Sequence, residues 1–556
     1  MKKLIFILIS VLVLSACSDS FLQTENKNNL DVGSFFKTEN DLLLATNAAY
    51  TPLAHGGMFG LSYFQILNNL DPYIVAENPM AGFDQMIYGP SDFTATYNTL
   101  YLGVFRTSDV LANIERVRSV INDDAKFNQY KGQLTALRGM YYFYLVTWFN
   151  KPIYYDETNV PSNPLVGLKN GTPEQFWDKL EDDLTFASAN LPASWPEAEL
   201  GRITKGAADA ELGKALLYKH YHYYLRFGKG NTPEAAANLI KAKAAFKRVM
   251  DSNTYHLIQP VTKNKANYQG ALLSNFSYVP IPVGNNTYAA ENNAESVWEI
   301  QYNDNNRNQG GYLPGWQWGG NLLYQYYSPL GYRNFEILPT LWFEYETVGA
   351  PAGYDRDPRA HATCYLDGDT LDWRPVSGMN IPFVSALHAK SIVSNFKLYT
   401  GSVAPPSVAI GLKKYYYPQF NKLADPNATN PPLSAPFNVR VIRYADVLLM
   451  YAEASFQVDA DADGSGLAAL NLVRDRAGMP FISALTPATI IHERTCELAT
   501  EGHYYNDIVR WSFDPKFPID LGNLFNNQFK TRNLYFPIPQ TDIDANKGAL
   551  QQNPGW

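Results

Sequence analysis

Apolar residues recur about every 3.6 positions in two long parts of this chain, one on each side of a middle part that lacks the pattern. This period indicates amphipathic α-helices. In the first part it predicts helices over residues 39–50, 97–120, 127–149, 173–190, 204–227 and 233–250. In the last part it predicts helices over residues 443–454 and 467–477, and a third that begins after Thr486 and runs to residue 501.

A stripe of small residues occurs twice, 74 positions apart, with the spacing i, i+4 and i+7 on two of the predicted helices. The residues are Gly132, Ala136, Gly139, Gly206, Ala210 and Gly213. Small side chains let a neighbouring helix approach closely, and the separation is near two units of about 34 residues, which favours stacked tetratricopeptide-like helix pairs. The alternative is a coincidence between two unrelated helix faces.

Pro, Gly, Asn and Tyr dominate the middle part, where short strand-like runs such as residues 296–300 stand between turns. A stretch this long with little regular structure usually carries function in a compact protein. We therefore divide the chain into a leader (1–16), an N-terminal helical region (17–250), a loop-rich ligand-binding region (251–438) and a C-terminal helical region (439–556) that packs back on the N-terminal helices.

The leader has the pattern of a lipoprotein signal peptide. Two lysines precede an apolar run over residues 4–14, and two small residues lead into Cys17. Small residues before a cysteine are typical of a site where the leader is removed and the cysteine is lipidated. The run is about half as long as the roughly twenty residues that span a bilayer, so we predict lipid attachment at Cys17 and no transmembrane anchor. An ordinary secretory signal is the alternative.

Charge and cysteine content exclude several classes. The chain has 45 Lys and Arg against 53 Asp and Glu, a net charge of -8 at pH 7. This balance argues against nucleic acid and anionic lipid head groups as partners. Besides Cys17 only Cys364 and Cys496 occur, too few for a disulfide framework. The chain also has 38 Tyr and 10 Trp, and an excess of these residues is typical of surfaces that bind ligands or partners.

Five motifs follow one another in the C-terminal part. They are RYADVLL at residues 443–449, NLVRDRAG at 471–478, ERTCELATEGH at 493–503, DIVRW at 507–511 and Ile538-Pro539. Together with the leader and with residues 137–143, which precede a proline turn, they resemble the SusD/RagB family of outer-membrane nutrient-uptake lipoproteins. The resemblance covers nearly the whole chain.

The resemblance implies a mainly α-helical, SusD-like fold in which four tetratricopeptide-like helix pairs support a loop-rich irregular region with a few short strands. It also implies a lipid-anchored protein of the outer membrane, facing the cell exterior, that captures oligosaccharides and delivers them to a SusC-like TonB-dependent transporter. It implies no cofactor and no catalytic activity. Two alternatives stay open, a lipoprotein of the same family that captures peptides and a secreted glycoside hydrolase.

Aromatic residues crowd a glycine-rich stretch of the middle part, and we expect them to bind the ligand. They are Tyr312, Trp316, Trp318, Tyr324 and Tyr326. Sugar rings present C–H faces that lie on indole or phenol planes, while sugar hydroxyls need hydrogen-bonding partners. The family resemblance points in addition to Asp71, Tyr73, Tyr97 and Asn98. The alternative is that the tryptophans fill the irregular region as core residues.

Two further groups of charged residues favour structural roles. Glu493, Arg494, Glu497 and Glu501 share one predicted helix, and we expect Arg494 to pair with Glu497 or Glu501 in a scaffold of ion pairs that Arg510 closes.

Asp459, Asp461 and Asp463 copy the first half of an EF-hand loop, but position twelve is Leu470, where such a loop needs a bidentate glutamate. We expect a solvated turn, with a calcium site as the alternative.

Overall fold

The mainly helical fold expected from the sequence is confirmed. The computed structural model describes residues 35–76, 80–162, 167–276, 281–302, 321–327, 335–365, 410–415 and 435–556. Cys17 and the predicted leader lie outside these ranges. The strands of the described chain are two to five residues long and form four two-stranded antiparallel sheets. Within the described residues, no helix has both the length and the apolar content needed to cross a membrane.

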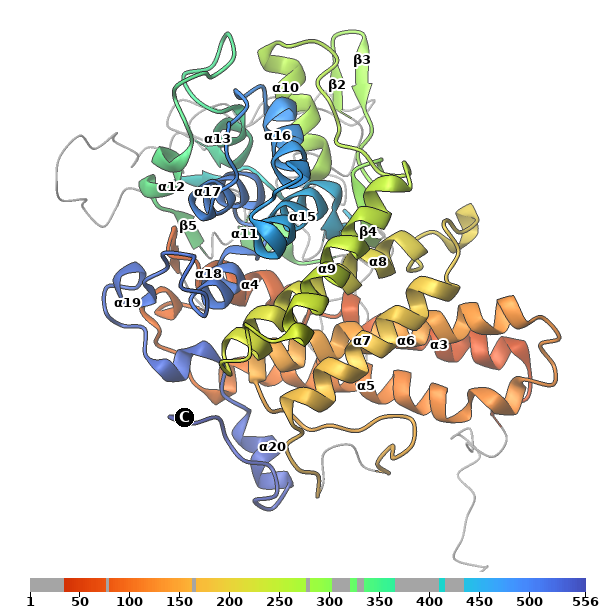
Figure 1. The fold of residues 1–556 in the computed structure, drawn as a ribbon. Helices are drawn as coiled ribbons and strands as arrows, with labels where there is room; N and C mark the ends of the chain where they lie inside the picture. Colours follow the sequence, from red (N-terminus) through yellow and green to blue (C-terminus); the bar gives the residue numbers. More distant parts are fainter. Residues whose placement is uncertain are drawn as a thin grey trace, which may run out of the picture.

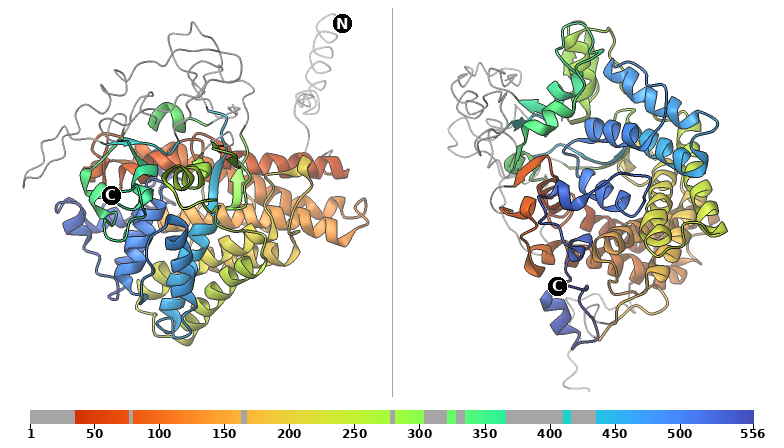
Figure 2. Two further views of the ribbon diagram at one scale, coloured as in Figure 1. Left: turned by 90° about the horizontal axis from the view of Figure 1, so that it is seen from above. Right: turned by 60° about the vertical axis from the view of Figure 1, so that its left-hand side comes forward.

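Eight helices of the described chain, each at least 13 residues long, pack one against the next in a continuous array (Figure 1). In packing order they are α3 (Glu39–Ala54), α5 (Thr94–Asn113), α6 (Asp124–Phe149), α7 (Pro173–Asn190), α8 (Lys205–Lys219), α9 (Pro233–Asp251), α15 (Tyr444–Asp459) and α16 (Ser465–Ala477). Taken two at a time, they give the four helix pairs that the family resemblance implies. Seen from above, the N-terminal helices, in red and orange, extend beyond the rest of the described fold (Figure 2).

Threonine caps explain where several helices of the chain begin. The side chains of Thr172, Thr232 and Thr486 each accept a hydrogen bond from the backbone N–H three residues on. A proline follows each threonine as the first helical residue, where it loses no hydrogen bond and already has a helical φ angle. The starts of α7, α9 and α17 (Pro487–Leu498) are therefore set by local sequence.

The repeated stripe of small residues lies where paired helices touch. A Cβ atom added at Gly139 of α6 would lie 3.0 Å from Leu184 of α7, and one added at Gly213 of α8 would lie 2.7 Å from Phe246 of α9. Larger side chains there would force the paired helices apart. The two stripes occupy equivalent positions in successive helix pairs, which supports an internal repeat over coincidence.

Short elements connect the array to the middle of the chain. They are α4 (Ser62–Asn69), β1 (Ile74–Ala76), α10 (Lys265–Leu273), β2 (Ile281–Val283), β3 (Asn286–Tyr288), β4 (Ser296–Ile300), α11 (Leu323–Tyr327), β5 (Phe335–Ile337), α12 (Pro339–Glu344), α13 (Pro358–Thr363), β6 (Cys364–Tyr365), β7 (Gly411–Leu412) and β8 (Val439–Arg443). Strand β4 pairs with β8, so the middle of the chain is joined directly to the start of α15. Buried residues from both helical parts and the middle form one hydrophobic core.

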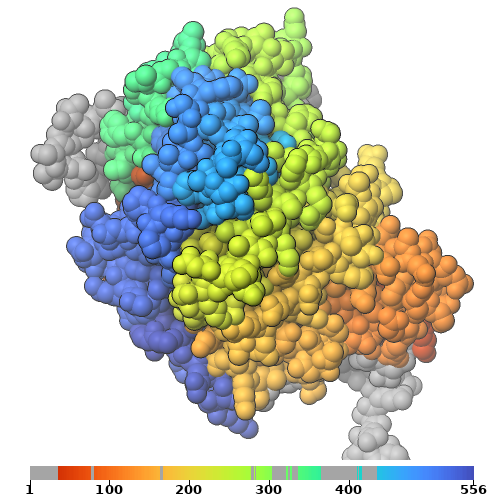
Figure 3. Space-filling view, in the orientation of Figure 1, coloured from red at the N-terminus to blue at the C-terminus, as the bar shows by residue number. Residues whose placement is uncertain are grey.

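The C-terminal segment packs on the N-terminal helices. Beyond α17 it forms α18 (Tyr504–Trp511), α19 (Leu521–Leu524) and α20 (Gln540–Ala545). The ring of Phe536 stacks on Phe93 with the centroids 4.4 Å apart, and the Phe536 N–H donates to the carbonyl oxygen of Trp148 at 2.7 Å. In the space-filling view this segment, in dark blue, borders both α9 and the orange N-terminal helices (Figure 3).

Buried ion pairs join the middle of the chain to the C-terminal helices. Arg443, at the end of β8, bonds Glu497 of α17 at 2.6 Å and Glu295 at 2.9 Å. Arg476 contacts the same two glutamates, and Arg359 of α13 reaches Glu497 at 3.2 Å. All five side chains are at most 4% exposed. The geometry therefore confirms the scaffold role predicted for Glu497.

The predicted partners of Arg494 are wrong. Instead of a glutamate of its own helix, Arg494 binds Asp446 of α15 and Asp507 of α18, both at 2.8 Å. Arg510 also binds Asp507 at 2.8 Å and contacts Glu453, so the two arginines share a second buried network. The reason is that arginines from three other elements already occupy the glutamates of α17, an arrangement that helical spacing does not reveal.

Several predicted helix ends also differ from the structure. The helix predicted over residues 97–120 is α5, which ends at Asn113 and is followed by a 3₁₀ turn, η3 (Ile114–Val117). Helix α17 stops at Leu498 and not at residue 501, because Lys414 and Arg443 donate to the backbone oxygens at its end and Thr500 takes a left-handed conformation (φ 64°). The helix predicted over residues 204–227 is α8 followed by a π-helical turn, η5 (His220–Leu225).

Candidate functional site

The predicted ligand-binding residues fall into three groups. Tyr312, Trp316 and Trp318 lie outside the described residues, and Tyr324 lies in α11, where only its backbone is described. Tyr326, also in α11, is half-buried, and Asn98 is exposed on α5. Tyr97 lies in α5, and Asp71 and Tyr73 lie between α4 and β1.

Tyr97 is a core residue, contrary to its predicted role. Its side chain is 0% exposed and packs against Tyr101 and Phe149, with ring centroids 4.7 and 5.0 Å away. The neighbouring Asn98 faces solvent because successive side chains on a helix point about 100° apart. Proximity in sequence therefore grouped an inward and an outward residue, and only Asn98 is accessible to a ligand.

Asp71 and Tyr73 lie just after the C-terminal end of α4. Asp71 is 5% exposed, and its carboxylate accepts a hydrogen bond from the Tyr73 N–H at 2.9 Å. The Tyr73 hydroxyl donates to Glu344 at 3.3 Å, and its ring lies 5.2 Å from that of Tyr504. Glu344 in turn bonds His492 at 2.9 Å. The pair is thus built into a polar cluster.

Replacing Asp71 by asparagine is expected to stabilise the protein more at high pH than at low pH. Burial raises the pKa of Asp71 from 3.8 to about 7, although the bond from the Tyr73 backbone acts in the opposite direction. Between about pH 4 and 7 the folded protein keeps a proton that the unfolded chain has lost, so this carboxyl lowers stability as pH rises through that window. Asparagine has no such cost. Urea unfolding midpoints at pH 4.5 and 8 measure the difference from the parent.

The exposed Asp182→Asn serves as the matched control and should change neither midpoint. A stability difference for Asp71→Asn that is the same at both pH values would contradict the expectation.

One turn holds both ends of the aromatic segment predicted to bind the ligand. The Tyr302 hydroxyl donates to the carbonyl oxygen of Ala54 at 3.0 Å, and the Leu322 N–H donates to the carbonyl oxygen of Gly60 at 2.9 Å. The chain therefore enters and leaves residues 303–320 beside the turn that follows α3. A Cβ at Gly57 in this turn would lie 2.2 Å from Oγ1 of Thr99, so the turn packs tightly on α5, next to Asn98.

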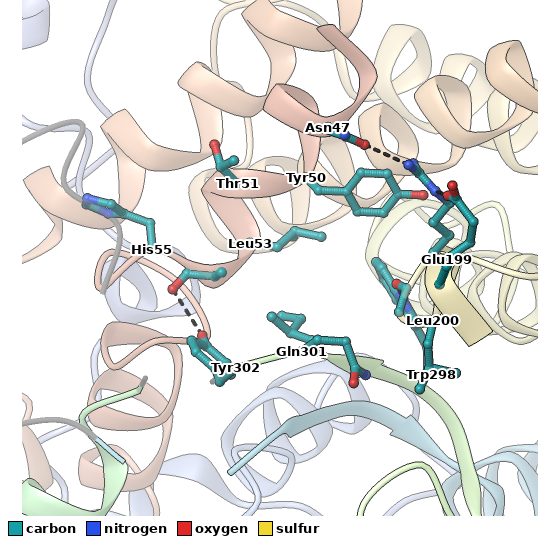
Figure 4. A pocket seen from close by; sticks show the side chains of 15 residues that line it. Asn47, Tyr50, Thr51, Leu53, His55, Glu199, Leu200, Trp298, Gln301 and Tyr302 are labelled. Carbon is teal, nitrogen blue, oxygen red and sulfur yellow. Dashed lines mark hydrogen bonds and ion pairs between the residues drawn. The ribbon is translucent and has the colours of Figure 1, made fainter. Parts of the chain in front are cut away.

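A pocket of about 350 Å³ opens beside this turn (Figure 4). It lies between α3, the turn before α8 and the end of β4. Its lining consists of Asn47, Tyr50, Thr51, Leu53, Ala54, His55, Ala198, Glu199, Leu200, Gly201, Arg202, Trp298, Ile300, Gln301 and Tyr302. The volume is at the small end of the range for ligand pockets, which is roughly 300–1,000 Å³.

Polar side chains of the pocket are held by defined bonds. Ile203 N–H donates to the Tyr50 hydroxyl at 3.2 Å, and that hydroxyl donates to Gln133 at 3.0 Å. The Gln301 amide donates to Asn292 at 3.0 Å and accepts from Asn438 at 2.8 Å. These bonds fix the side chains before a ligand arrives, which lowers the entropic cost of binding.

The aromatic side chains Trp298 and Tyr302 form walls and not open platforms. They are 4% and 8% exposed, and the Trp298 indole N–H donates to the carbonyl oxygen of Gly201 at 2.9 Å. Of the three aromatic side chains in the described lining, only Tyr50 is partly exposed, so the walls offer little open aromatic surface.

Sequence reasoning did not find this pocket. Its lining comes from three segments about 100 to 250 positions apart, and none contains a recognisable binding motif. The sequence predicts the strand at residues 296–300, but nothing local shows that its end meets α3. The one hint of this pocket in the sequence is Leu200, a large apolar residue in a polar turn. In the structure its side chain is 51% exposed.

The carboxylates of the Asp-rich turn between α15 and α16 accept hydrogen bonds from backbone N–H groups of the turn and of the start of α16. Asp461 accepts from the N–H groups of Gly466 and Leu467, both at 2.7 Å, and Asp463 accepts from Ser465 N–H and pairs with Lys243. The carboxylate of Asp459 accepts from the N–H of Ala462. In the described part of the chain, no group of three or more His, Cys, Asp or Glu side chains is arranged to hold a metal ion. These bonds account for the three aspartates as hydrogen-bond acceptors of the turn.

Comparisons with known proteins agree with this architecture. A model of the SusD family matches residues 291–556, and a model described as starch-binding, associating with the outer membrane, matches residues 21–225. A SusD-like protein of Bacteroides ovatus is 22% identical over 549 residues, which cover 95% of this chain and 85% of the relative.

Solved structures share the fold. A laminarin-binding SusD-like protein has a TM-score of 0.67 at 22% identity, covering 94% of this chain and 100% of that chain. Surface glycan-binding protein A from Bacteroides thetaiotaomicron, in complex with laminarihexaose, has a TM-score of 0.67 at 20% identity, with 93% and 99% covered. With two family models matched along most of its length, a relative aligned over nearly all of it and the same fold, this chain belongs to the SusD/RagB family.

Proposed function

We propose that this protein is a non-catalytic lipoprotein of the outer membrane that captures oligosaccharides outside the cell and delivers them to a SusC-like TonB-dependent transporter. Cys17 carries the lipid, and the soluble body displays the binding site. Membership in the SusD/RagB family supports this role, as does the description of the model that matches residues 21–225. The names of two structural neighbours, one laminarin-binding and one bound to laminarihexaose, support a glycan as the ligand.

One observation in the chain itself carries the proposal. The segment that contains Tyr312, Trp316 and Trp318 is attached at both ends to the turn that borders the pocket. Aromatic planes from that segment and fixed amide, hydroxyl and guanidinium groups from the pocket are the two kinds of surface that a sugar needs. In this proposal the oligosaccharide lies across both, and Asn98 adds a hydrogen-bonding side chain beside the turn.

Calorimetry on the lipid-free protein, beginning at Ser18, tests the proposal. We expect laminari-, xyloglucan- or malto-oligosaccharides of six or more units to bind, and mixed peptides of similar mass to give no heat. Chromatography of the same mixtures after a day is expected to recover every sugar at its original length. Binding of peptides alone would establish the peptide-capturing alternative, and shortened sugars would establish the hydrolase.

A further inference from the structure

The charges of the pocket are already matched by one another. Of its described lining residues, only Glu199 and Arg202 carry a full charge, and they form an ion pair within one turn. Arg202 also donates to Asn47 at 2.8 Å and to Gln133 at 3.0 Å. All three nitrogens of its guanidinium thus have partners within the protein, and its side chain is only 13% exposed.

The one histidine of the lining does not add a positive charge at neutral pH. Burial, and then the nearby charge of Arg106, lower the pKa of His55 below its ordinary value of 6.5. Its Nδ1 atom lies 3.1 Å from the Gly57 N–H and 3.2 Å from the Thr99 hydroxyl, so it can serve as the acceptor of the N–H bond only when unprotonated.

The remaining surface is neutral and mixed. Asn47, Thr51 and Gln301 offer amide and hydroxyl groups, while Leu53 and Leu200 offer apolar surface. This combination fits a ring that has C–H faces and hydroxyl edges. A carboxylate or sulfate placed here would lose water, would find no unpaired cation among the lining side chains, and would approach Glu199. Arg106, which lies outside the lining, already donates to the Thr51 hydroxyl and to the carbonyl oxygen of Ala48.

From this balance of charge we infer that the pocket beside Tyr302 binds an uncharged sugar unit and discriminates against uronic acids and sulfated sugars, with the Glu199–Arg202 pair as the specificity determinant. The inference rests on the proposed function, because it names the class of glycan that the site accepts. Glu199 acts by occupying Arg202, which would otherwise attract an anionic substituent.

The test compares three forms of one oligosaccharide. The tightest neutral ligand of the calorimetric panel is oxidised at its primary hydroxyls to carboxylates, and part of that product is converted to the methyl ester. We expect the protein to bind the ester within about threefold of the parent sugar, and the acid at least tenfold more weakly than the ester. The ester controls for the altered hydroxyls, so the acid reports charge alone.

Glu199→Gln frees the guanidinium of Arg202. The penalty for the acid, which is its loss of affinity relative to the ester, should then fall at least fivefold. Glu197→Gln, on the same turn but outside the lining, is the matched control and should leave the penalty unchanged. Equal binding of acid and ester by the parent protein overturns the inference alone, as does a Glu199→Gln variant with the parent's penalty. If no oligosaccharide binds in any form, the proposed function fails and this inference fails with it.

Discussion

Glu497→Ala is expected to destabilise the protein by about 3–5 kcal/mol, the usual cost of removing one partner from a buried charge network. The substitution leaves Arg443, Arg476 and Arg359 without the carboxylate on which they converge. Each of these guanidiniums is at most 4% exposed, so water does not replace the lost partner. The effect reaches the middle of the chain, because Arg443 ends the strand that pairs with β4.

Equilibrium unfolding in guanidinium chloride at pH 7 measures this loss. Glu497→Gln keeps the shape of the side chain and some of its hydrogen bonds. Its free energy of unfolding should therefore lie between those of the parent and the alanine variant. Glu174→Ala removes a partner of Lys229 on the surface, where ion pairs contribute about 0–1 kcal/mol, and is the matched control. Equal midpoints for Glu497→Ala and Glu174→Ala would show that the buried network is not a source of stability.

The same network should lose its contribution in acid. Burial alone would raise the pKa of Glu497, but Arg476, Arg443 and Arg359 hold it well below its ordinary value of 4.5. A carboxyl with a lowered pKa in the folded state stabilises the protein above its unfolded-state pKa and loses this effect as pH falls. The difference between parent and Glu497→Ala should therefore shrink below about pH 4.5.

The double variant Trp316→Ala, Trp318→Ala is expected to weaken oligosaccharide binding at least about 30-fold, or roughly 2 kcal/mol. The walls of the pocket bury Trp298 and Tyr302, and in the proposed function the aromatic residues of the segment that begins at residue 303 supply the main stacking surface. Large aromatic anchors carry most of the energy in sites of this kind. Calorimetry with the best ligand of the panel measures the change.

Phe481→Ala is the control for this variant. Phe481 is an exposed aromatic residue, 66% accessible, in the loop before α17 and outside the pocket lining. Its removal should leave affinity unchanged. Parent-like binding by the double tryptophan variant would show that these residues belong to the core, as the alternative reading of the sequence holds.

Local sequence predicted the frame of this protein well. The Thr-Pro starts of α7, α9 and α17 need only the residues at each helix end, and the glycine stripes of α6 and α8 predict close packing from helical spacing alone. These features depend on contacts within one helix or between neighbouring helices, so the order of residues contains most of the information.

The features that could not be predicted depend on contacts between residues far apart in the sequence. The partners of Arg494 lie 48 and 13 positions away, on two other helices, and helical spacing favoured glutamates that distant arginines occupy. The inward position of Tyr97 depends on Phe149 of the next helix. The pocket needs segments separated by up to about 250 residues, and their meeting is a property of the folded chain.

The paired tethers at Ala54 and Gly60 hold the two ends of residues 303–320 without using any side chain of that segment. The carbonyl oxygens that hold Tyr302 and Leu322 are six positions apart on one turn, so the two ends of the segment are held by residues outside 303–320. Doubling the length of such an excursion costs only about 0.6 kcal/mol in closure entropy. Under the proposed function, a new sugar preference can therefore arise by exchange of this one segment.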